Sequence, residues 1–161
     1  MNYVIRKMEK RDKQAVQQVA RASWNSTYEG IIPLHIQDLF LDAAYSDKML
    51  DKRMAQTHLY VAEIDGKVVG FANFSSVQEN GEAELGAIYL YEEYQGQGIG
   101  TALLQEGMKL PGIKKIYINV EKDNEIGKNF YKAKGFEVVE EFDDDLYGHI
   151  TKMLRMVLDI S

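Results

Sequence analysis

The chain has 161 residues, of which 45% are hydrophobic and 27% are charged, a composition that predicts one globular domain over residues 1–161. It contains no cysteine, which excludes disulfides, thiolate metal sites and a cysteine nucleophile. Its net charge of −6 argues against a nucleic acid or an anionic membrane as partner and favours a cationic substrate, because like charges repel.

No apolar run approaches the roughly 20 residues that cross a bilayer, and the opening stretch MNYVIRKMEKRDKQ lacks the apolar centre of a signal peptide. We therefore expect a cytoplasmic protein. The three histidines, His35, His58 and His149, do not have the spacing of metal ligands, so we expect no metal.

The first half of the chain predicts a strand, two helical regions and three further strands. Asp12 is placed to cap the first helix, and Asp65-Gly66 is a dipeptide favoured in tight hairpins. In chain order we expect a strand over residues 3–8, a helix over 13–23, a loop over 24–33, a helical stretch over 35–54 with a break near 43–46, and strands over 59–64, 67–74 and 83–90.

The second half alternates helices with strands. Asn124 is placed to cap the second of these helices and Gly135 to end it. We expect helices over 98–110 and 125–134, a strand over 115–120, and strands over 137–142 and 149–158 around an acidic loop at 143–145. The resulting order, β-α-α-β-β-β-α-β-α-β-β, implies an α/β fold with one mixed sheet and helices on its faces.

The segment over residues 83–104 carries the strongest chemical signal. A strand is followed by a short loop, by glycines at the alternate positions 96, 98 and 100, and by an apolar-striped helix. Such glycines let successive backbone N–H groups point into one concavity, and a helix N-terminus adds unpaired donors. The arrangement suits a phosphate or pyrophosphate without any basic residue. The alternative is a glycine-rich turn that only starts a helix.

Two nucleotide-binding folds compete for this loop. A dinucleotide (dehydrogenase) site needs a third glycine where this chain has Thr101, although Glu121 could serve as its ribose acid. A methyltransferase loop needs an acid where this chain has Tyr94. Both folds place the glycine turn early in the chain, whereas here it follows residue 90 and leaves too few residues for either sheet.

Two motifs together resemble the GCN5-related N-acetyltransferases. Gln95-Gly96-Gln97-Gly98-Ile99-Gly100 is similar to the family's Gln/Arg-x-x-Gly-x-Gly/Ala motif. Asn124 followed by Phe130-Tyr131 and Gly135-Phe136 is similar to its later signature. The resemblance covers about residues 58–140 and implies an acetyltransferase of this fold, with splayed central parallel strands and acetyl-CoA as cosubstrate.

The resemblance also implies where the coenzyme lies. Its pantetheine arm would pair with the exposed backbone of Ile88, Tyr89 and Leu90, where an N–H could polarise the thioester carbonyl. Asn124 would contact the same arm, or serve only as a helix cap. The amides that would hold the pyrophosphate are those of Gln95, Gly96, Gln97, Gly98, Ile99, Gly100 and Thr101.

Catalysis would need an acid for the leaving thiolate and a base for the amine. Tyr131 matches the family's catalytic tyrosine, and the alternative is a packed helix aromatic. Glu84 resembles the base of the histone-acetylating branch, and the alternative is an exposed strand carboxylate. Strict alternation places Glu84, Gly86, Ile88 and Leu90 on one face, and glycine at position 86 would tolerate a bulge.

The acceptor wall in this family is the connection between the first two helices. Here it carries Trp24, Tyr28 and Glu29, and it resembles a bacterial subgroup related to the polyamine acetyltransferase PaiA. Aromatic faces and a carboxylate suit a polyamine such as spermidine, whereas Trp24 and Tyr28 could also simply pack together. The alternation over residues 149–158 is consistent with a homodimer strand or with an internal edge strand.

The sequence therefore favours direct transfer of an acetyl group from acetyl-CoA to a small-molecule or peptide amine. A non-catalytic acyl-CoA sensor and a small nucleotide-cofactor enzyme, such as a methyltransferase, are the alternatives. Binding of acetyl-CoA but not of S-adenosylmethionine or NAD separates the last from the others, and turnover of an amine panel separates the first two.

Overall fold

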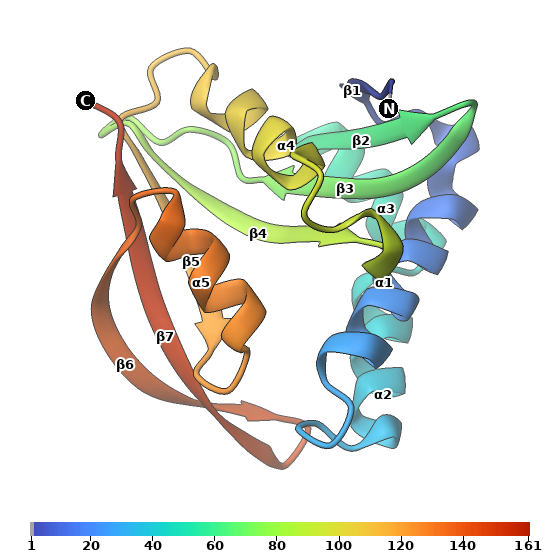
Figure 1. Ribbon diagram of the computed structural model, residues 1–161, viewed down its shortest axis with the longest axis vertical. Helices are drawn as coiled ribbons and strands as arrows, with labels where there is room; N and C mark the ends of the chain where they lie inside the picture. Colours follow the sequence, from blue (N-terminus) through green and yellow to red (C-terminus); the bar gives the residue numbers. More distant parts are fainter. Residues whose placement is uncertain (1) are drawn as a thin grey trace.

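Seven strands form one mixed sheet in the computed structural model, which describes residues 2–161 (Figure 1). Their order across the sheet is β1-β2-β3-β4-β5-β7-β6. The strands are β1 Val4–Lys7, β2 His58–Ile64, β3 Lys67–Phe74, β4 Glu82–Leu90, β5 Lys115–Glu121, β6 Glu137–Leu146 and β7 His149–Asp159. The predicted mixed α/β architecture is confirmed.

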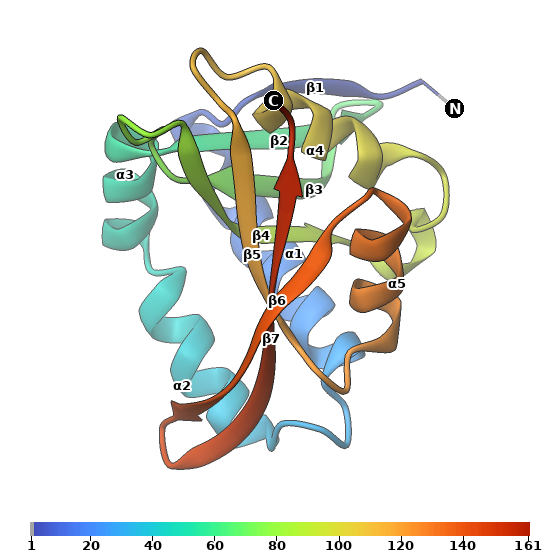
Figure 2. The same cartoon turned by 90° about the vertical axis from the view of Figure 1, so that its left-hand side faces the viewer.

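Helices cover both faces of the sheet, and each face has its own core (Figure 2). Helices α1 (Lys13–Thr27), α2 (Leu34–Ala44) and α3 (Asp47–Gln56) lie on one face, and helices α4 (Ile99–Met108) and α5 (Glu125–Ala133) lie on the other. The core under α1–α3 includes Val16, Val19, Leu50, Val61 and Phe71, and the core under α4 and α5 includes Phe74, Ile99, Leu103, Ile116 and Met156.

The break predicted in the second helical stretch is confirmed, but the predicted loop over residues 24–33 is partly wrong. Ser46 separates α2 from α3 and its hydroxyl accepts the Met49 N–H at 3.2 Å. Helix α1 continues to Thr27 because its apolar stripe continues: Trp24 and Tyr28 are each only 4% exposed. Burial of these two large rings outweighs the mediocre helix propensity of the segment.

The acidic residues at 143–145 do not form a loop. Strand β6 runs through them to Leu146, and the hairpin turn is Tyr147-Gly148, both with positive φ (50° and 87°). In β6, Asp143 pairs with Lys152 of β7 and Asp144 pairs with Thr151. The charges are tolerated because β6 is a solvent-exposed edge strand, where charge discourages pairing with other chains.

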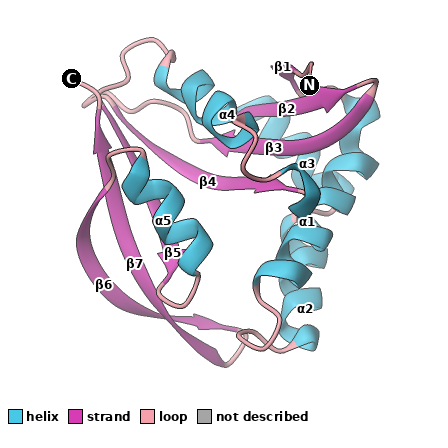
Figure 3. Cartoon of the chain, viewed as in Figure 1, coloured by secondary structure: helices cyan, strands magenta, loops and turns pink. Residues whose placement is uncertain are grey.

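The parallel strands β4 and β5 pair over three rungs only, from Glu82 with Lys115 to Glu84 with Tyr117. Beyond these rungs the strands diverge (Figures 1 and 3). We call the diverging parts, residues 85–90 of β4 and 118–121 of β5, the fork. The splayed central strands expected from the sequence are therefore present.

A bulge at Gly86 lies at the start of the fork. Asn73 of β3 pairs with Ala87 and Phe74 pairs with Leu85, which leaves Gly86 as an extra residue in β4. The bulge reverses the side-chain alternation, since Leu85 belongs to the α4–α5 core and Ala87 to the α1–α3 core. Strict alternation along β4 is therefore wrong: Ile88 and Leu90 pack on the α4–α5 core, the face opposite to that of Glu84.

Replacing Gly107 by alanine tests the seating of α4 on the sheet. A Cβ at this position would lie 2.1 Å from Cε2 of the buried Phe74 ring. Overpacking of this kind costs about 1–3 kcal/mol, against about 1 kcal/mol gained in helix propensity. We expect Gly107→Ala to lower the urea midpoint of unfolding. Gln105→Ala, exposed on the same helix, should leave it nearly unchanged, and equal midpoints for both variants would contradict this packing.

Candidate functional site

The fork leaves two strand edges without a strand partner on their inner side. Strand β4 is bonded to β3 on its outer edge, and β5 is bonded to β7 on its outer edge, but past Glu84 and Tyr117 the two strands do not bond to each other. The residues predicted to hold an extended ligand arm, Ile88 to Leu90, lie on this free edge. Backbone groups there can pair with amides of a ligand as they would with a third strand.

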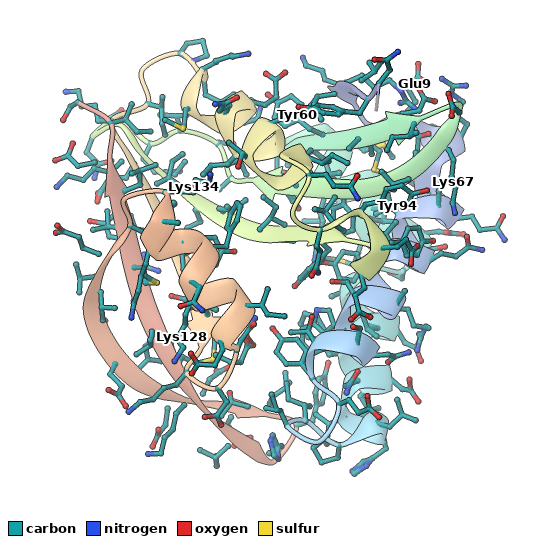
Figure 4. The ribbon with its side chains drawn as sticks, viewed as in Figure 1. Glu9, Tyr60, Lys67, Tyr94, Lys128 and Lys134 are labelled. Carbon is teal, nitrogen blue, oxygen red and sulfur yellow. The ribbon has the colours of Figure 1, made fainter. Side chains whose placement is uncertain are left out.

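A loop rich in free amides follows β4. Gly96 and Gly98 have φ of 75° and 87°, and Gly98 occupies the N-cap position of α4. Within residues 2–161, the N–H groups of residues 96–101 have no backbone acceptor. Such a nest of donors at a helix N-terminus is an anion site that suits a pyrophosphate. Tyr94, labelled in Figure 4, precedes the loop.

Helix α5 packs against the first turn of α4. A Cβ at Gly100 would lie 3.3 Å from the Phe130 ring, so the glycine allows the two helices to approach. Asn124 begins α5, and its Oδ1 accepts the Gly127 N–H at 2.9 Å, so its predicted role as a cap is confirmed.

Tyr131, the predicted acid, lies on α5 next to the fork and packs edge-on against Phe130 and Phe136, with ring centroids 5.4 and 5.3 Å away. Burial, with a smaller contribution from the charge of Glu121, raises the pKa of Tyr131 well above its usual value of about 10. The phenol therefore stays protonated near neutral pH and can act as a proton donor.

Glu121, which the sequence suggested only as a dinucleotide-site acid, is a further ionisable group at the fork. It is the last residue of β5, and its carboxylate accepts the Tyr28 hydroxyl at 2.5 Å. Burial raises the pKa of Glu121, while the hydrogen bond from Tyr28 opposes that rise. Its negative charge, after burial, also raises the pKa of Tyr28. The apolar alternation of Ile116, Ile118 and Val120 predicts that the Glu121 side chain lies on the opposite face of β5. The sequence gives no sign that Tyr28 contacts Glu121.

Glu84, the predicted base, lies on the last paired rung, at the closed end of the fork. Its carboxylate forms an ion pair with the Arg155 guanidinium of β7 and is about half exposed. Arg155 also donates to Asn119 at 3.0 Å and stacks over the Tyr117 ring. The structure thus places Glu84 on the acceptor face but ties it to a permanent cation.

The predicted acceptor residues fall into two groups. Trp24 is buried, stacked on Phe40 with ring centroids 4.2 Å apart and edge-on to Tyr28 at 4.7 Å. Its Nε1–H donates to the Tyr89 hydroxyl at 2.9 Å. Glu29 is exposed instead, and it lines an open depression of about 850 Å³. Trp24 and Tyr28 thus pack against each other, which was the alternative to an open aromatic surface. Glu29 faces solvent.

Residues from three elements line this depression. They are Ala22, Asn25, Ser26 and Glu29 of α1 and the residues after it, Gly30 to Leu34, Gln37 of α2, and His149 of β7. Gln37 is 2% exposed and its Oε1 has no hydrogen-bond partner among residues 2–161. The depression therefore offers one negative charge, that of Glu29, and one unpaired acceptor, the Gln37 Oε1.

Neither a metal-binding group nor a membrane-spanning helix is present among residues 2–161. No group of three histidine, aspartate or glutamate side chains there is arranged to hold a metal ion. None of the helices in that range is long and apolar enough to cross a membrane.

Residues 4–136 match the sequence model of the acetyltransferase (GNAT) family. A spermidine N(1)-acetyltransferase of Thermoplasma acidophilum is 32% identical over 154 residues, which are 90% of this chain and 94% of that one. A spermine/spermidine N(1)-acetyltransferase of Bacillus subtilis is 29% identical over 70% of this chain and 83% of its own. The crystal structure of the PaiA N-acetyltransferase of T. acidophilum in complex with coenzyme A has a TM-score of 0.88 at 28% identity, covering 99% of both chains.

Proposed function

The chain belongs to the acetyltransferase (GNAT) family, whose members use acetyl-CoA, and from this premise we propose that it acetylates a primary amine of a polyamine such as spermidine. The observation that carries the polyamine class is a half-buried carboxylate, Glu121, at the open end of the fork on the face of α1. An alkylammonium is the ligand that such a site attracts. The names of the two similar polyamine acetyltransferases support the same class.

The donor half of the proposed site is on the α4–α5 side. The amides of Gly96 to Thr101 would hold the coenzyme pyrophosphate, whereas the predicted Gln95 amide already donates to the Glu92 carbonyl at 3.1 Å. The free edge at Ile88, Tyr89 and Leu90 would pair with the pantetheine arm of the coenzyme. Both features fit the coenzyme, since one supplies unpaired donors and the other an unpaired strand edge. Asn124 would contact the same arm. The bound coenzyme supplies an acetyl thioester, which is activated toward an amine.

Tyr131 would act as the acid for the leaving thiolate. Its protonated phenol borders the fork, where the inner edges of β4 and β5 have no strand partner. The proposed transfer is direct and needs no covalent acyl-enzyme, which agrees with the absence of cysteine. On the acceptor half, Tyr28 and Glu29 would face the amine, and Trp24 would hold Tyr28 and Tyr89 in place.

Replacing Gly98 by alanine tests the pyrophosphate loop. Its φ of 87° is unfavourable for any residue with a Cβ, although a Cβ there would meet nothing within 4 Å. Left-handed backbone costs about 1–2 kcal/mol per residue, so the loop should leave this conformation and scatter its amides. We expect the affinity for coenzyme A, measured by calorimetry, to fall about 10-fold, which is about 1.4 kcal/mol.

Gly112→Ala is the matched control for this variant. Gly112 has φ of 79° and equally open space around its missing Cβ, but it lies in the turn before β5. It should show a similar loss of stability with unchanged affinity for coenzyme A. Equal coenzyme A affinities for Gly98→Ala and Gly112→Ala would show that the glycine loop does not bind the coenzyme.

Replacing Tyr131 by phenylalanine removes the proposed acid and keeps the ring. Because general acid catalysis contributes about 100-fold or more, we expect kcat to fall by that factor while the Kd of coenzyme A stays nearly constant. Release of free thiol measures the rate. Tyr60→Phe, which removes a partly buried phenol on β2 (Figure 4), should retain the parent rate. An unchanged kcat for Tyr131→Phe would exclude the phenol as acid.

The acceptor class is tested by a panel of amines. If the acidic acceptor face selects alkylammonium groups, thiol release from acetyl-CoA should be fastest with spermidine and spermine. Amino acids, aminoglycosides and peptide amines should react more slowly, by about 10-fold or more in kcat/KM, because each lost charged contact costs about 1.5–3 kcal/mol. A faster reaction with a peptide amine than with spermidine would contradict the polyamine proposal and indicate a peptide acceptor.

A further inference from the structure

Glu121 and Tyr131 reach the fork from opposite faces of the sheet. Strand β5 buries Ile116, Ile118 and Val120 in the α4–α5 core, so Glu121 lies on the other face, where it meets Tyr28, the residue after α1. Tyr131 comes from α5. The residues of α1 pack in the core of one face, and Tyr131 packs against the core of the other face. An acceptor that enters from the α1 face would therefore meet Glu121 before it reaches a thioester beside Tyr131.

The Glu121 carboxylate lacks a counter-cation in the protein. Charges that are shielded from water are normally paired. Glu121 is half-buried, yet within residues 2–161 no lysine or arginine forms a salt bridge with it. The neighbouring cations already have partners: Lys122 pairs with Glu141 at 2.8 Å, and Arg155 pairs with Glu84. The Tyr28 hydroxyl is the one side-chain donor to Glu121 there. The Glu121 carboxylate can therefore still pair with one cation from a ligand.

The two carboxylates near the fork, Glu84 and Glu121, differ in whether a cation of the protein is already bound to them. Glu84 is about half exposed, lies at the closed end and carries its own cation, Arg155. Glu121 lies at the open end and carries none. The Arg155 guanidinium already occupies both oxygens of the Glu84 carboxylate, so Glu84 has a cation in place of a ligand ammonium. Position and charge therefore both favour Glu121.

We propose that Glu121 binds the acceptor ammonium and takes its proton, and that Tyr28 is the positioning residue that holds the Glu121 carboxylate. This inference rests on the proposed amine acetylation and names the group that recognises and activates the amine. It replaces Glu84 as the base expected from the sequence.

The proposed transfer balances as follows. Glu121 takes one proton from the bound ammonium, and the neutral nitrogen forms a bond with the thioester carbonyl carbon. Tyr131 gives its proton to the sulfur as the carbon–sulfur bond breaks. The second proton of the nitrogen returns to the Tyr131 phenolate, and the proton on Glu121 passes to solvent. The products are the acetylated amine, the free thiol and one proton.

Groups from four elements face Glu121 and set its ionisation. They are Tyr28 at the C-cap of α1, Tyr89 of β4, Tyr131 of α5 and Asp144 of β6. Burial and Asp144 raise the pKa of Glu121, whereas the Tyr28 hydrogen bond lowers it. The carboxylate is the active form, so activity should be lost as pH falls through that raised pKa. Removing the Tyr28 donor should raise the pKa further and move the loss of activity to higher pH.

The experiment is the pH dependence of kcat/KM for Glu121→Gln and Tyr28→Phe, using the best amine found for the parent chain. Glutamine still accepts the Tyr28 hydroxyl, so the fold should be retained, and the melting temperature checks this. Near pH 7 only about one alkylamine in two thousand is neutral. Glu121→Gln should therefore lose about 100-fold or more in kcat/KM at pH 7, and its rate should rise with pH up to the pKa of the amine.

Tyr28→Phe should shift the acid limb of the profile to higher pH, an effect that a purely structural defect would not produce. Neither variant should change the Kd of coenzyme A. Glu137→Gln, which removes one exposed carboxylate from β6, is the control for net charge and should match the parent profile.

Three outcomes would overturn the proposal. The first is a parent-like acid limb in Glu121→Gln, and the second is loss of that limb in Glu84→Gln alone. The third is a Tyr28→Phe profile identical to that of the parent. If the parent acetylates a peptide amine and not spermidine, the polyamine class fails while the same profiles, taken with the peptide amine, still decide the role of Glu121. A parent inactive on every amine overturns both proposals.

Discussion

The divergence of β4 and β5 is the constraint on which the rest of the structure depends. Two parallel strands in the middle of a sheet ordinarily bond along their whole length, because unpaired backbone groups are costly to bury. Here the pairing stops after three rungs. The bulge at Gly86 reverses the alternation of β4 where the fork begins, and the outer edges stay bonded to β3 and β7. The sheet therefore remains one unit with a free backbone edge inside it.

The two faces of the fork have opposite electrostatic character. On the α4 face, free amides at a helix N-terminus favour an anion without any basic side chain in residues 91–101. On the α1 face, the Glu121 carboxylate favours a cation. An acidic chain with a net charge of −6 can attract an alkylammonium over its whole surface. It can still bind a pyrophosphate, since the dipoles that bind it are local.

Aromatic packing makes the acceptor face rigid. Trp24 stacks on Phe40, meets Tyr28 edge-on and donates to the Tyr89 hydroxyl. These contacts fix the phenol of Tyr28, which in turn fixes the Glu121 carboxylate. A tryptophan that is fully enclosed thus still bears on the site, because it holds two residues that border the fork. This indirect role differs from the open aromatic surface that the sequence suggested.

Local patterns determined the element order, the hairpin at Asp65-Gly66, the break before Ser46, the cap at Asn124 and the glycine loop, since each depends on residues close together in the chain. Local patterns did not predict contacts between residues that are distant in the sequence. Tyr28 and Glu121 are far apart in the chain and meet only because the C-terminal end of α1 brings Tyr28 to the end of β5. Arg155 reaches Glu84 only because β7 lies beside β5. Charge and burial at a site depend on such long-range contacts, so only the tertiary structure could distinguish a carboxylate that already has its cation from one that lacks it.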